Sequence, residues 1–351
     1  MRSAASTAAA FHTTILGMPK VRWGVLGVAK IAMEKVIPAM QHGEWSAVTA
    51  IASRDPEKAR AAAARLGIAK SYGSYDELVA DPDIDAIYNP LPNDLHVPWT
   101  IRAAERGKHV LCEKPIALSA AEARTLIAAR DRTGVRIQEA FMVRTHPQWL
   151  KVRELVREGA IGELRAMVGV FSFFNRDPAN IRNLPASGGG ALMDIGCYLI
   201  NTSRFVFERE PARVSGLIDR DPGMGVDRLT SLMLDYESGH AVGTCSTQMV
   251  PFQRIQILGT TGRLELEIPF NAPLDRPCRI VRDTGADLFG AGRTVIEVDT
   301  CNQYTIQGDL FSKAIVEDEA VPVPLEDAVQ NMACIDAVVR SAASGRWEVP
   351  Q

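Results

Sequence analysis

The chain has 351 residues, of which 46% are hydrophobic and 23% are charged, with 39 Lys and Arg against 42 Asp and Glu. This length allows two domains with sizeable cores. The near-neutral charge, without a basic run, argues against nucleic acid or an anionic membrane as a partner. No window approaches the ~18 consecutive apolar residues of a membrane helix. The six cysteines lie far apart without metal-ligand spacing, so we expect reduced thiols, no metal site and a cytoplasmic protein.

The first twenty residues are rich in Ala, Ser and Thr and contain a single Arg. They lack both the basic start and the long apolar stretch of a signal peptide, and a twin-Arg signal needs a second Arg. We therefore expect residues 1–20 to be a flexible extension.

From Val21 onward, short apolar runs alternate with segments of helical spacing. The strand-like runs are residues 21–27, 48–52, 84–88 and 109–112, and the helical segments are residues 31–41, 56–66, 99–106 and 120–133. This alternation is typical of an α/β fold with a doubly wound parallel sheet and right-handed crossovers. It predicts a dinucleotide-binding Rossmann domain over residues 21–143.

Beyond residue 159 the pattern becomes one of successive strands. They are expected at residues 164–174, 213–218, 230–236, 241–248, 254–258, 263–268 and 294–298, with helices at 309–316 and 326–343. Strands that follow one another across turn signals predict an α+β domain on an open, mostly antiparallel sheet. We expect residues 144–351 to form this domain for substrate and oligomerisation, with the last helix packing back on the first domain.

A glycine turn follows the first predicted strand and reads Gly27-Val28-Ala29-Lys30-Ile31-Ala32. In the dinucleotide fingerprint G-x-G-x-x-G/A the small residues permit a tight turn, close approach of the pyrophosphate and helix packing. Gly27 and the last Ala fit the pattern, whereas Ala29 replaces the middle glycine. We expect Gly27, Ala29, Lys30 and Ile31 to hold a pyrophosphate at the helix N-terminus, although the motif is weak by itself.

The second predicted strand ends in Ser53-Arg54. A carboxylate at this place would bind the ribose 2′-hydroxyl and repel a 2′-phosphate. A serine hydroxyl and a guanidinium suit a phosphate instead. The pair therefore predicts NADP, with NAD as the alternative if Arg54 is only a solvated charge.

Later segments occur in an order that is informative as a set. They are Asn-Pro-Leu-Pro-Asn-Asp-Leu-His at 89–96, Glu-Lys-Pro at 113–115, Glu-Ala-Phe-Met at 139–142, Gly-Gly-Gly-Ala-Leu-Met-Asp-Ile-Gly-Cys-Tyr at 188–198 and Gly-Thr-Thr-Gly-Arg at 259–263. With the opening Trp-Gly-Val-Leu-Gly at 23–27, the chain resembles the GFO/IDH/MocA family of glucose–fructose oxidoreductase and inositol dehydrogenase. The resemblance covers nearly the whole chain.

The resemblance implies an enzyme that moves hydride between a nicotinamide cofactor and a carbinol, often on a sugar. Lys114 matches the lysine of the Glu-Lys-Pro motif, beside the nicotinamide, and Pro115 matches a proline that is often cis. Asp194 and Tyr198 match the second catalytic segment. Many relatives carry His at the position of Tyr198. A tyrosine at this position resembles the sugar oxidoreductase and dihydrodiol dehydrogenase branches of the family. Cofactor contacts are expected from Pro90, Leu91, Asn93, His96, Glu113 and Lys114.

Elementary chemistry supports a role for the lysine and tyrosine. Oxidation of a carbinol needs a base for the hydroxyl proton, and free Tyr has a pKa of ~10. A nearby ammonium stabilises the phenolate, so we expect Lys114 to lower the pKa of Tyr198. Asp194 lies one helical turn earlier and is expected to orient substrate or hold Lys114. Alternatively, Tyr198 is a core aromatic, Asp194 caps a helix and His96 only packs.

Two arginines are candidates for substrate contact. Arg144 follows the Glu-Ala-Phe-Met segment, where a salt bridge at the domain junction is equally compatible. Arg182 precedes the triple glycine, where an exposed surface position is the alternative.

The leading functional prediction is an NADP-dependent dehydrogenase or reductase of an aldopyranose or similar cyclic polyol, without a metal. Alternatives are a trans-dihydrodiol or 1,5-anhydrofructose-type substrate, or a non-catalytic nucleotide sensor. A homodimer or homotetramer through the C-terminal sheet is expected, because alternating apolar positions in residues 232–236 and 241–245 indicate an apolar face that needs a cover.

Overall fold

The computed structural model describes residues 14–15 and 18–351, so the predicted extension lies mostly outside the described residues. The first part of the chain forms a six-stranded parallel sheet with the order β5-β4-β3-β6-β7-β8, which confirms the doubly wound fold. Its strands are β3 (Val21–Leu26), β4 (Ser46–Ala52), β5 (Lys70–Tyr72), β6 (Ala86–Asn89), β7 (His109–Cys112) and β8 (Ile137–Glu139). Two short strands, β1 (Thr14–Ile15) and β2 (Met18–Pro19), pair with each other ahead of this sheet.

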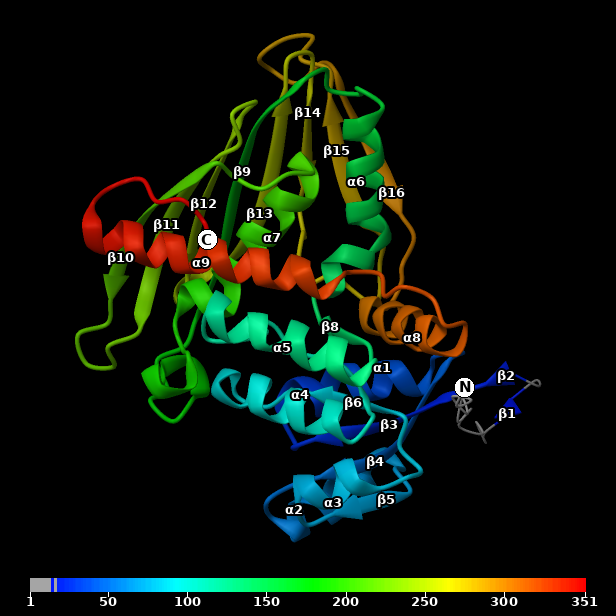
Figure 1. Cartoon of the computed structure of the whole chain (residues 1–351). Coiled ribbons are helices and arrows are strands. Elements are labelled where there is room, and N and C mark those ends of the chain that lie inside the picture. Colours follow the sequence, from blue (N-terminus) through cyan, green and yellow to red (C-terminus); the bar gives the residue numbers. More distant parts are fainter. Residues whose placement is uncertain (1–13, 16–17) are drawn as a thin grey trace, which may run out of the picture.

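Helices cover both faces of the parallel sheet (Figure 1). They are α1 (Ile37–Gln41), which continues a π-helical turn at Ala32–Val36, α2 (Pro56–Leu66), α3 (Tyr75–Ala80), α4 (His96–Glu105) and α5 (Ala120–Thr133). One core gathers side chains of α1 and α2 with Trp23 and Val25, and the other gathers those of α3, α4 and α5 with Ile87 and Val110. Side-chain oxygens of Asp55, Ser74 and Ser119 cap α2, α3 and α5, which explains where these helices begin.

The second part forms an eight-stranded sheet with the order β10-β11-β12-β9-β13-β14-β15-β16. Its strands are β9 (Leu164–Phe174), β10 (Arg213–Arg220), β11 (Asp227–Asp235), β12 (His240–Ser246), β13 (Gln248–Gly259), β14 (Arg263–Leu266), β15 (Cys278–Asp283) and β16 (Arg293–Val298). Only β12 and β9 run parallel, so the predicted open, mostly antiparallel sheet is confirmed.

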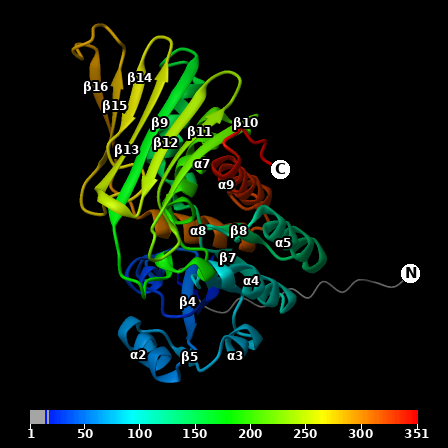
Figure 2. The same cartoon turned by 90° about the vertical axis from the view of Figure 1, so that its left-hand side faces the viewer.

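Helices α6 (Pro147–Arg157), α7 (Cys197–Phe207) and α9 (Leu325–Ser344) lie on one side of this second sheet, and the other side is open (Figure 2). Helix α8 (Gln303–Val316) packs against α1 and the parallel sheet instead. Helix α9 contacts both β10 and α5, so the last long helix does pack on the dinucleotide-binding part. The predicted boundary near residue 143 stays a prediction.

One expectation about the open face is wrong. The alternating apolar side chains of β11 and β12 point to the helix-covered face of the sheet and are buried there. They are Leu232, Leu234, Tyr236, Ala241 and Cys245. The residues between them in the sequence point to the open face. Its exposed apolar side chains include Val168, Leu217, Met233 and Val242.

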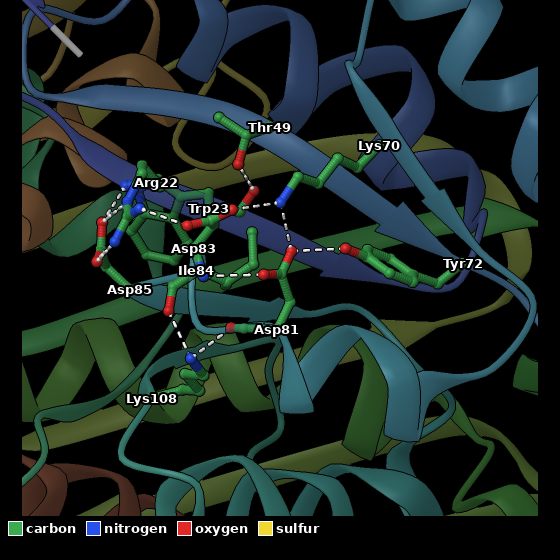
Figure 3. A network of polar contacts seen from close by, with 10 residues as sticks. All are labelled: Arg22, Trp23, Thr49, Lys70, Tyr72, Asp81, Asp83, Ile84, Asp85 and Lys108. Carbon is green, nitrogen blue, oxygen red and sulfur yellow. Dashed lines mark hydrogen bonds and ion pairs between the residues drawn. The ribbon is translucent and has the colours of Figure 1, made fainter. Parts of the chain in front are cut away.

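A polar network closes the amino-terminal edge of the parallel sheet (Figure 3). Asp81 accepts hydrogen bonds from the Tyr72 hydroxyl at 2.5 Å and from Lys70 Nζ at 2.9 Å. The buried ammonium of Lys108 donates to the carbonyl oxygens of Asp81 and Ile84, both at 2.7 Å. These bonds join the starts of β5 and β7 to the loop before β6, at the edge opposite to that where parallel sheets bind ligands.

Candidate active site

A cavity of about 840 Å³ opens at the carboxyl ends of the parallel strands, where the second sheet faces them. Most residues that the sequence selects for the site lie in its wall. They are Ala29, Lys30, Ile31, Pro90, Leu91, Asn93, His96, Glu113, Lys114, Arg182, Asp194 and Tyr198. The topology thus brings the glycine turn, the loops after β6 and β7 and the start of α7 to one place.

The turn after β3 fits a dinucleotide phosphate. Gly27 has a φ of +82°, which side chains rarely adopt, and a Cβ there would lie 3.1 Å from a methyl of Leu91. The N–H of Gly27 donates to the carbonyl of Ala52 at the end of β4, so the β3–β4 pairing continues to the first residue of the turn. Ala29, Lys30 and Ile31 then line the cavity at the start of a helix, where free N–H groups favour an anion.

Lys114 and Asp194 form a buried ion pair in the cavity wall. Lys114 Nζ lies 3.2 Å from Asp194 Oδ1 and 2.6 Å from its carbonyl oxygen, and Arg182 Nε donates to Asp194 Oδ2 at 2.7 Å. Burial opposes both charges, but the pairing outweighs it and keeps the pKa of Lys114 above, and that of Asp194 below, their usual values. The Lys114–Pro115 peptide is cis, as expected.

The ring of Tyr198 lies among other aromatic rings beside this pair. Its centroid is 5.1 Å from that of Phe141 and 5.9 Å from that of Phe171, both edge-on. Lys114 Nζ is 5.0 Å from the Tyr198 ring centroid, and the phenol hydroxyl donates to Met142 Sδ at 3.3 Å. The structure therefore brings Lys114 and Tyr198 together, but the ammonium faces the ring rather than the oxygen.

The expected lowering of the pKa of Tyr198 is wrong in this arrangement. Burial raises the pKa well above 10, and the neighbouring Tyr304 and Glu113 act in the same direction. The charge of Lys114 is meanwhile compensated by Asp194. The phenol is consequently neutral at physiological pH.

Two further residues of the predicted set have clear partners. Tyr88 donates to Glu113 Oε1 at 2.6 Å, and burial raises the pKa of that carboxyl. The ring nitrogens of His96 lie 2.7 Å from the carbonyl oxygen of Leu91 and 2.8 Å from that of Pro115. His96 thus lies between the loop after β6 and the loop after β7. Burial lowers the pKa of His96 to about 4, so the ring is neutral at physiological pH and donates to only one of the two carbonyl oxygens.

Besides Gly27, three predicted residues lie outside the cavity wall. Arg144 is paired with Asp327 of α9 at 2.7 Å and stacks on Phe205, so it forms the salt bridge that the sequence left open, and its substrate contact stays a prediction. Ser53 is buried after β4, where its hydroxyl accepts from the N–H of Asp55. Arg54 is exposed beside it. Its phosphate contact stays a prediction.

Several wall residues lie outside the predicted set of site residues. Met142, Phe171, Gln253 and Tyr304 line the cavity from the crossover, the second sheet and α8. Met142 lies in a segment that the sequence does single out. The others carry no local signal, since only the pairing of β13 with β9 and the packing of α8 bring them here.

Within residues 14–15 and 18–351, no group of three or more His, Cys, Asp or Glu side chains is placed to hold a metal ion. No helix of the described chain has the length and apolar character needed to cross a membrane.

Comparisons with known proteins agree with this geometry. Residues 21–141 match the model described as "Oxidoreductase family, NAD-binding Rossmann fold", and residues 149–265 match the GFO/IDH/MocA C-terminal domain. An uncharacterized oxidoreductase of Rhizobium meliloti, ORF334, is 50% identical over 332 residues, covering 94% of this chain and 99% of the relative. A D-xylose 1-dehydrogenase (NADP(+)) of Haloferax volcanii is 40% identical over 329 residues, covering 92% and 98%.

A solved structure has the same architecture. The 3-ketoreductase KijD10 of Actinomadura kijaniata, in complex with NADP and TDP-benzene, superposes with a TM-score of 0.86 at 28% identity, covering 92% of this chain and 98% of that one. Since the two family models together span more than half of the sequence, the chain belongs to the GFO/IDH/MocA family of oxidoreductases.

Proposed function

We propose that this protein is an NADP-dependent oxidoreductase that moves hydride between nicotinamide and a carbinol or carbonyl carbon of an aldopyranose or similar cyclic polyol. The observation that carries the proposal is the Lys114–Asp194 ion pair beside the Tyr198 ring, in the same cavity as the glycine turn. A nucleotide sensor would have no need for a charged lysine and a phenol at this place.

The cofactor is assigned to the residues that fit it. Gly27, Ala29, Lys30 and Ile31 would hold the pyrophosphate, and Glu113 and Pro90 would border the nicotinamide end. When bound, NADPH would supply the hydride in reduction and NADP⁺ would accept it in oxidation. We favour NADP over NAD because Arg54 replaces the usual carboxylate, and because the xylose dehydrogenase and the ketoreductase are both named with NADP.

The side chains divide the remaining work. The Lys114 ammonium, kept charged by Asp194, donates hydrogen bonds to the reacting oxygen and stabilises negative charge there. The neutral phenol of Tyr198 gives its proton to that oxygen in reduction and recovers it in oxidation. Arg182 orients Asp194 and borders the space for the substrate.

The substrate class follows from the wall and from the relatives. Aromatic side chains of Phe171 and Tyr198 offer apolar faces, while Arg182, Asp194 and Gln253 offer polar groups. A polyhydroxylated ring presents both kinds of surface. The sugar substrates named for the relatives point the same way.

We further propose that the chain forms a homodimer or homotetramer through the open face of the second sheet. Val168 and Val242 pair across β9 and β12 and are about two-fifths exposed, and Leu217 is 74% exposed. Exposed apolar side chains on neighbouring strands favour a cover, and a symmetric copy is the simplest cover.

The test is turnover of NADP or NADPH against a panel of aldoses and their lactones, with Tyr198→Phe as the variant. We expect Tyr198→Phe to lower kcat by about 10²-fold or more, with the NADPH dissociation constant unchanged. Tyr236→Phe is the matched control, because it removes a buried hydroxyl bonded to Ser203 outside the cavity. Normal turnover by Tyr198→Phe would refute the proton-transfer role. Cofactor binding by the wild type without turnover of any compound would favour a sensor.

A further inference from the structure

Gln253 lies in the cavity wall on strand β13 and is the neighbour of Phe171 across the β13–β9 pairing. It shares its strand face with the buried residues Ile255 and Ile257. Its side chain therefore extends to the helix side of the sheet, where the cavity is, and not to the open face. Gln253 is half-buried.

The orientation of the Gln253 amide is determined by backbone groups. Its Oε1 accepts two hydrogen bonds, from the N–H of Phe270 at 2.9 Å and from the N–H of Asn271 at 3.1 Å. Because backbone N–H groups only donate, the amide oxygen must face them and the NH₂ group must face away. Among the described residues, Nε2 of Gln253 has no hydrogen-bond partner, and it is not a buried orphan. The cavity thus receives a side chain that can only donate.

The anchor of this amide is part of the wall around Tyr198. The ring of Phe270 is stacked on that of Phe171 at 4.7 Å and lies 5.3 Å from the ring of Tyr198. Phe270 is fully buried among the rings of Trp149, Phe171 and Tyr198, so packing restrains its position. The amide donor and the phenol are consequently held by one rigid aromatic cluster.

We propose that Gln253 is a specificity-determining residue that donates a hydrogen bond from Nε2 to one oxygen of the polyol substrate. The acceptor is a hydroxyl or ring oxygen on the side of the substrate that faces the second sheet. This inference rests on the proposed function and adds the group that selects among polyols. A site that hydrogen-bonds a substrate oxygen discriminates strongly against an analogue without it, since the polar group is then left unpaired.

Two variants separate the donor from the scaffold. Gln253→Glu keeps an oxygen for the N–H groups of Phe270 and Asn271 but replaces the donor with an acceptor, and Gln253→Leu removes both. We expect Gln253→Glu to lower kcat/KM at least tenfold, mainly through a higher KM, with NADPH affinity unchanged. Gln330→Glu, an exposed change of the same type on α9, is the control and should match the wild type.

Singly deoxygenated aldoses identify the contact. For one of these deoxy sugars, the kcat/KM of the wild type should be at least tenfold lower than for the parent aldose. For the same sugar, the kcat/KM of Gln253→Glu and Gln253→Leu should fall less than threefold. Binding of the same aldoses to the NADP-bound proteins, measured by calorimetry, should show the same pattern. The inference is overturned if the variants keep the KM of the wild type and lose as much kcat/KM as the wild type on every deoxy sugar. The proposed function would still stand. A wild-type holoprotein that neither binds nor converts any polyol overturns both.

Discussion

The phenol of Tyr198 is enclosed by aromatic rings, and this surround decides which protonation state it holds. A charged phenolate is costly there, since the one ammonium nearby is already paired with Asp194 and faces the ring. Its hydroxyl donates a hydrogen bond to the thioether sulfur of Met142, which is a weak acceptor. A substrate oxygen is a stronger acceptor than sulfur, so in the proposed reaction the phenol would donate its proton to the substrate. The neutral phenol suits reduction directly.

Arg54 carries the cofactor prediction at the scale of one residue. It is exposed at the end of β4, beside the turn that contains Gly27. We expect Arg54→Asp to lower the ratio of kcat/KM for NADP to that for NAD by about 10²-fold, because a phosphate partner is lost and a like charge is gained. The exposed Arg106, at the end of α4, supplies the control Arg106→Asp, which should leave the ratio unchanged. A variant that still prefers NADP would show that Arg54 does not select the phosphate.

Motif residues could be placed from the sequence, whereas their partners could not. Lys114 and Asp194, which lie in two of the motif segments, form an ion pair, which is one of the two roles expected for Asp194. The sequence left Arg144 between a substrate contact and a salt bridge, since its partner Asp327 is supplied by a helix 183 residues later in the chain. Gln253 carries no signal in the sequence, because only strand pairing and two backbone N–H groups give it a defined direction.

At the scale of elements, the start of the helix that presents Asp194 depends on a residue from β11. Asp227 accepts the N–H of Leu192 at 2.7 Å, and a Cβ at Gly190 would lie 1.8 Å from its carboxylate. We expect Asp227→Ala to lower the free energy of unfolding by about 1–3 kcal/mol, since a buried N–H loses its acceptor, and to lower kcat at least tenfold. Urea unfolding and NADPH turnover measure the two effects. Asp219→Ala, half-exposed on β10, should change neither.

The amino-terminal edge of the parallel sheet predicts a pH dependence. Although burial opposes it, bonds from Tyr72 and Lys70 lower the pKa of Asp81 below 3.8. The ionised form therefore adds stability above pH 3.8, and this is lost as the pH falls through the lowered pKa. We expect Asp81→Asn to cost about 1–3 kcal/mol at pH 7 and progressively less below pH 4, measured by urea unfolding. Asp83→Asn, which is 63% exposed, should cost less than about 1 kcal/mol at either pH. An equal cost at pH 7 and pH 3 would contradict this account.

Helices and strands with a regular apolar pattern could be predicted from the sequence. Those in which charged residues interrupt the pattern could not. The apolar run of β7 and the capped segments of α2 and α5 begin and end where the sequence predicts. Strand β15 was missed because charged Arg279 and Arg282 interrupt its alternation. Helix α8 was expected to begin at residue 309 and begins at Gln303, capped by Asn302, because its apolar face packs on the parallel sheet.

At the scale of the whole molecule, the cavity forms where the second sheet faces the carboxyl ends of the parallel strands. The parallel sheet supplies the turn and loops at its carboxyl edge, and the second sheet supplies Phe171 and Gln253. Helix α9 packs against α5 and β10 and so joins the two halves. Spacing along the sequence predicts each half separately. Their mutual placement depends on packing between distant segments, such as the Arg144–Asp327 pair.

The open face of the second sheet leads to a prediction about assembly. Val168 lies at its centre, paired with Val242 on one side and Gln256 on the other, and is 43% exposed. We expect the wild type to have a mass in solution of twice or four times 38.2 kDa by light scattering. Val168→Lys should shift the protein towards the single-chain mass, because an ammonium would be buried without a partner between two copies. In a single chain this side chain reaches water, so the fold should persist. Leu288→Lys, at a loop position that is 98% exposed, is the control and should retain the wild-type mass. A wild-type protein with the mass of one chain, or a Val168→Lys variant that assembles as the wild type does, would exclude this face as the interface.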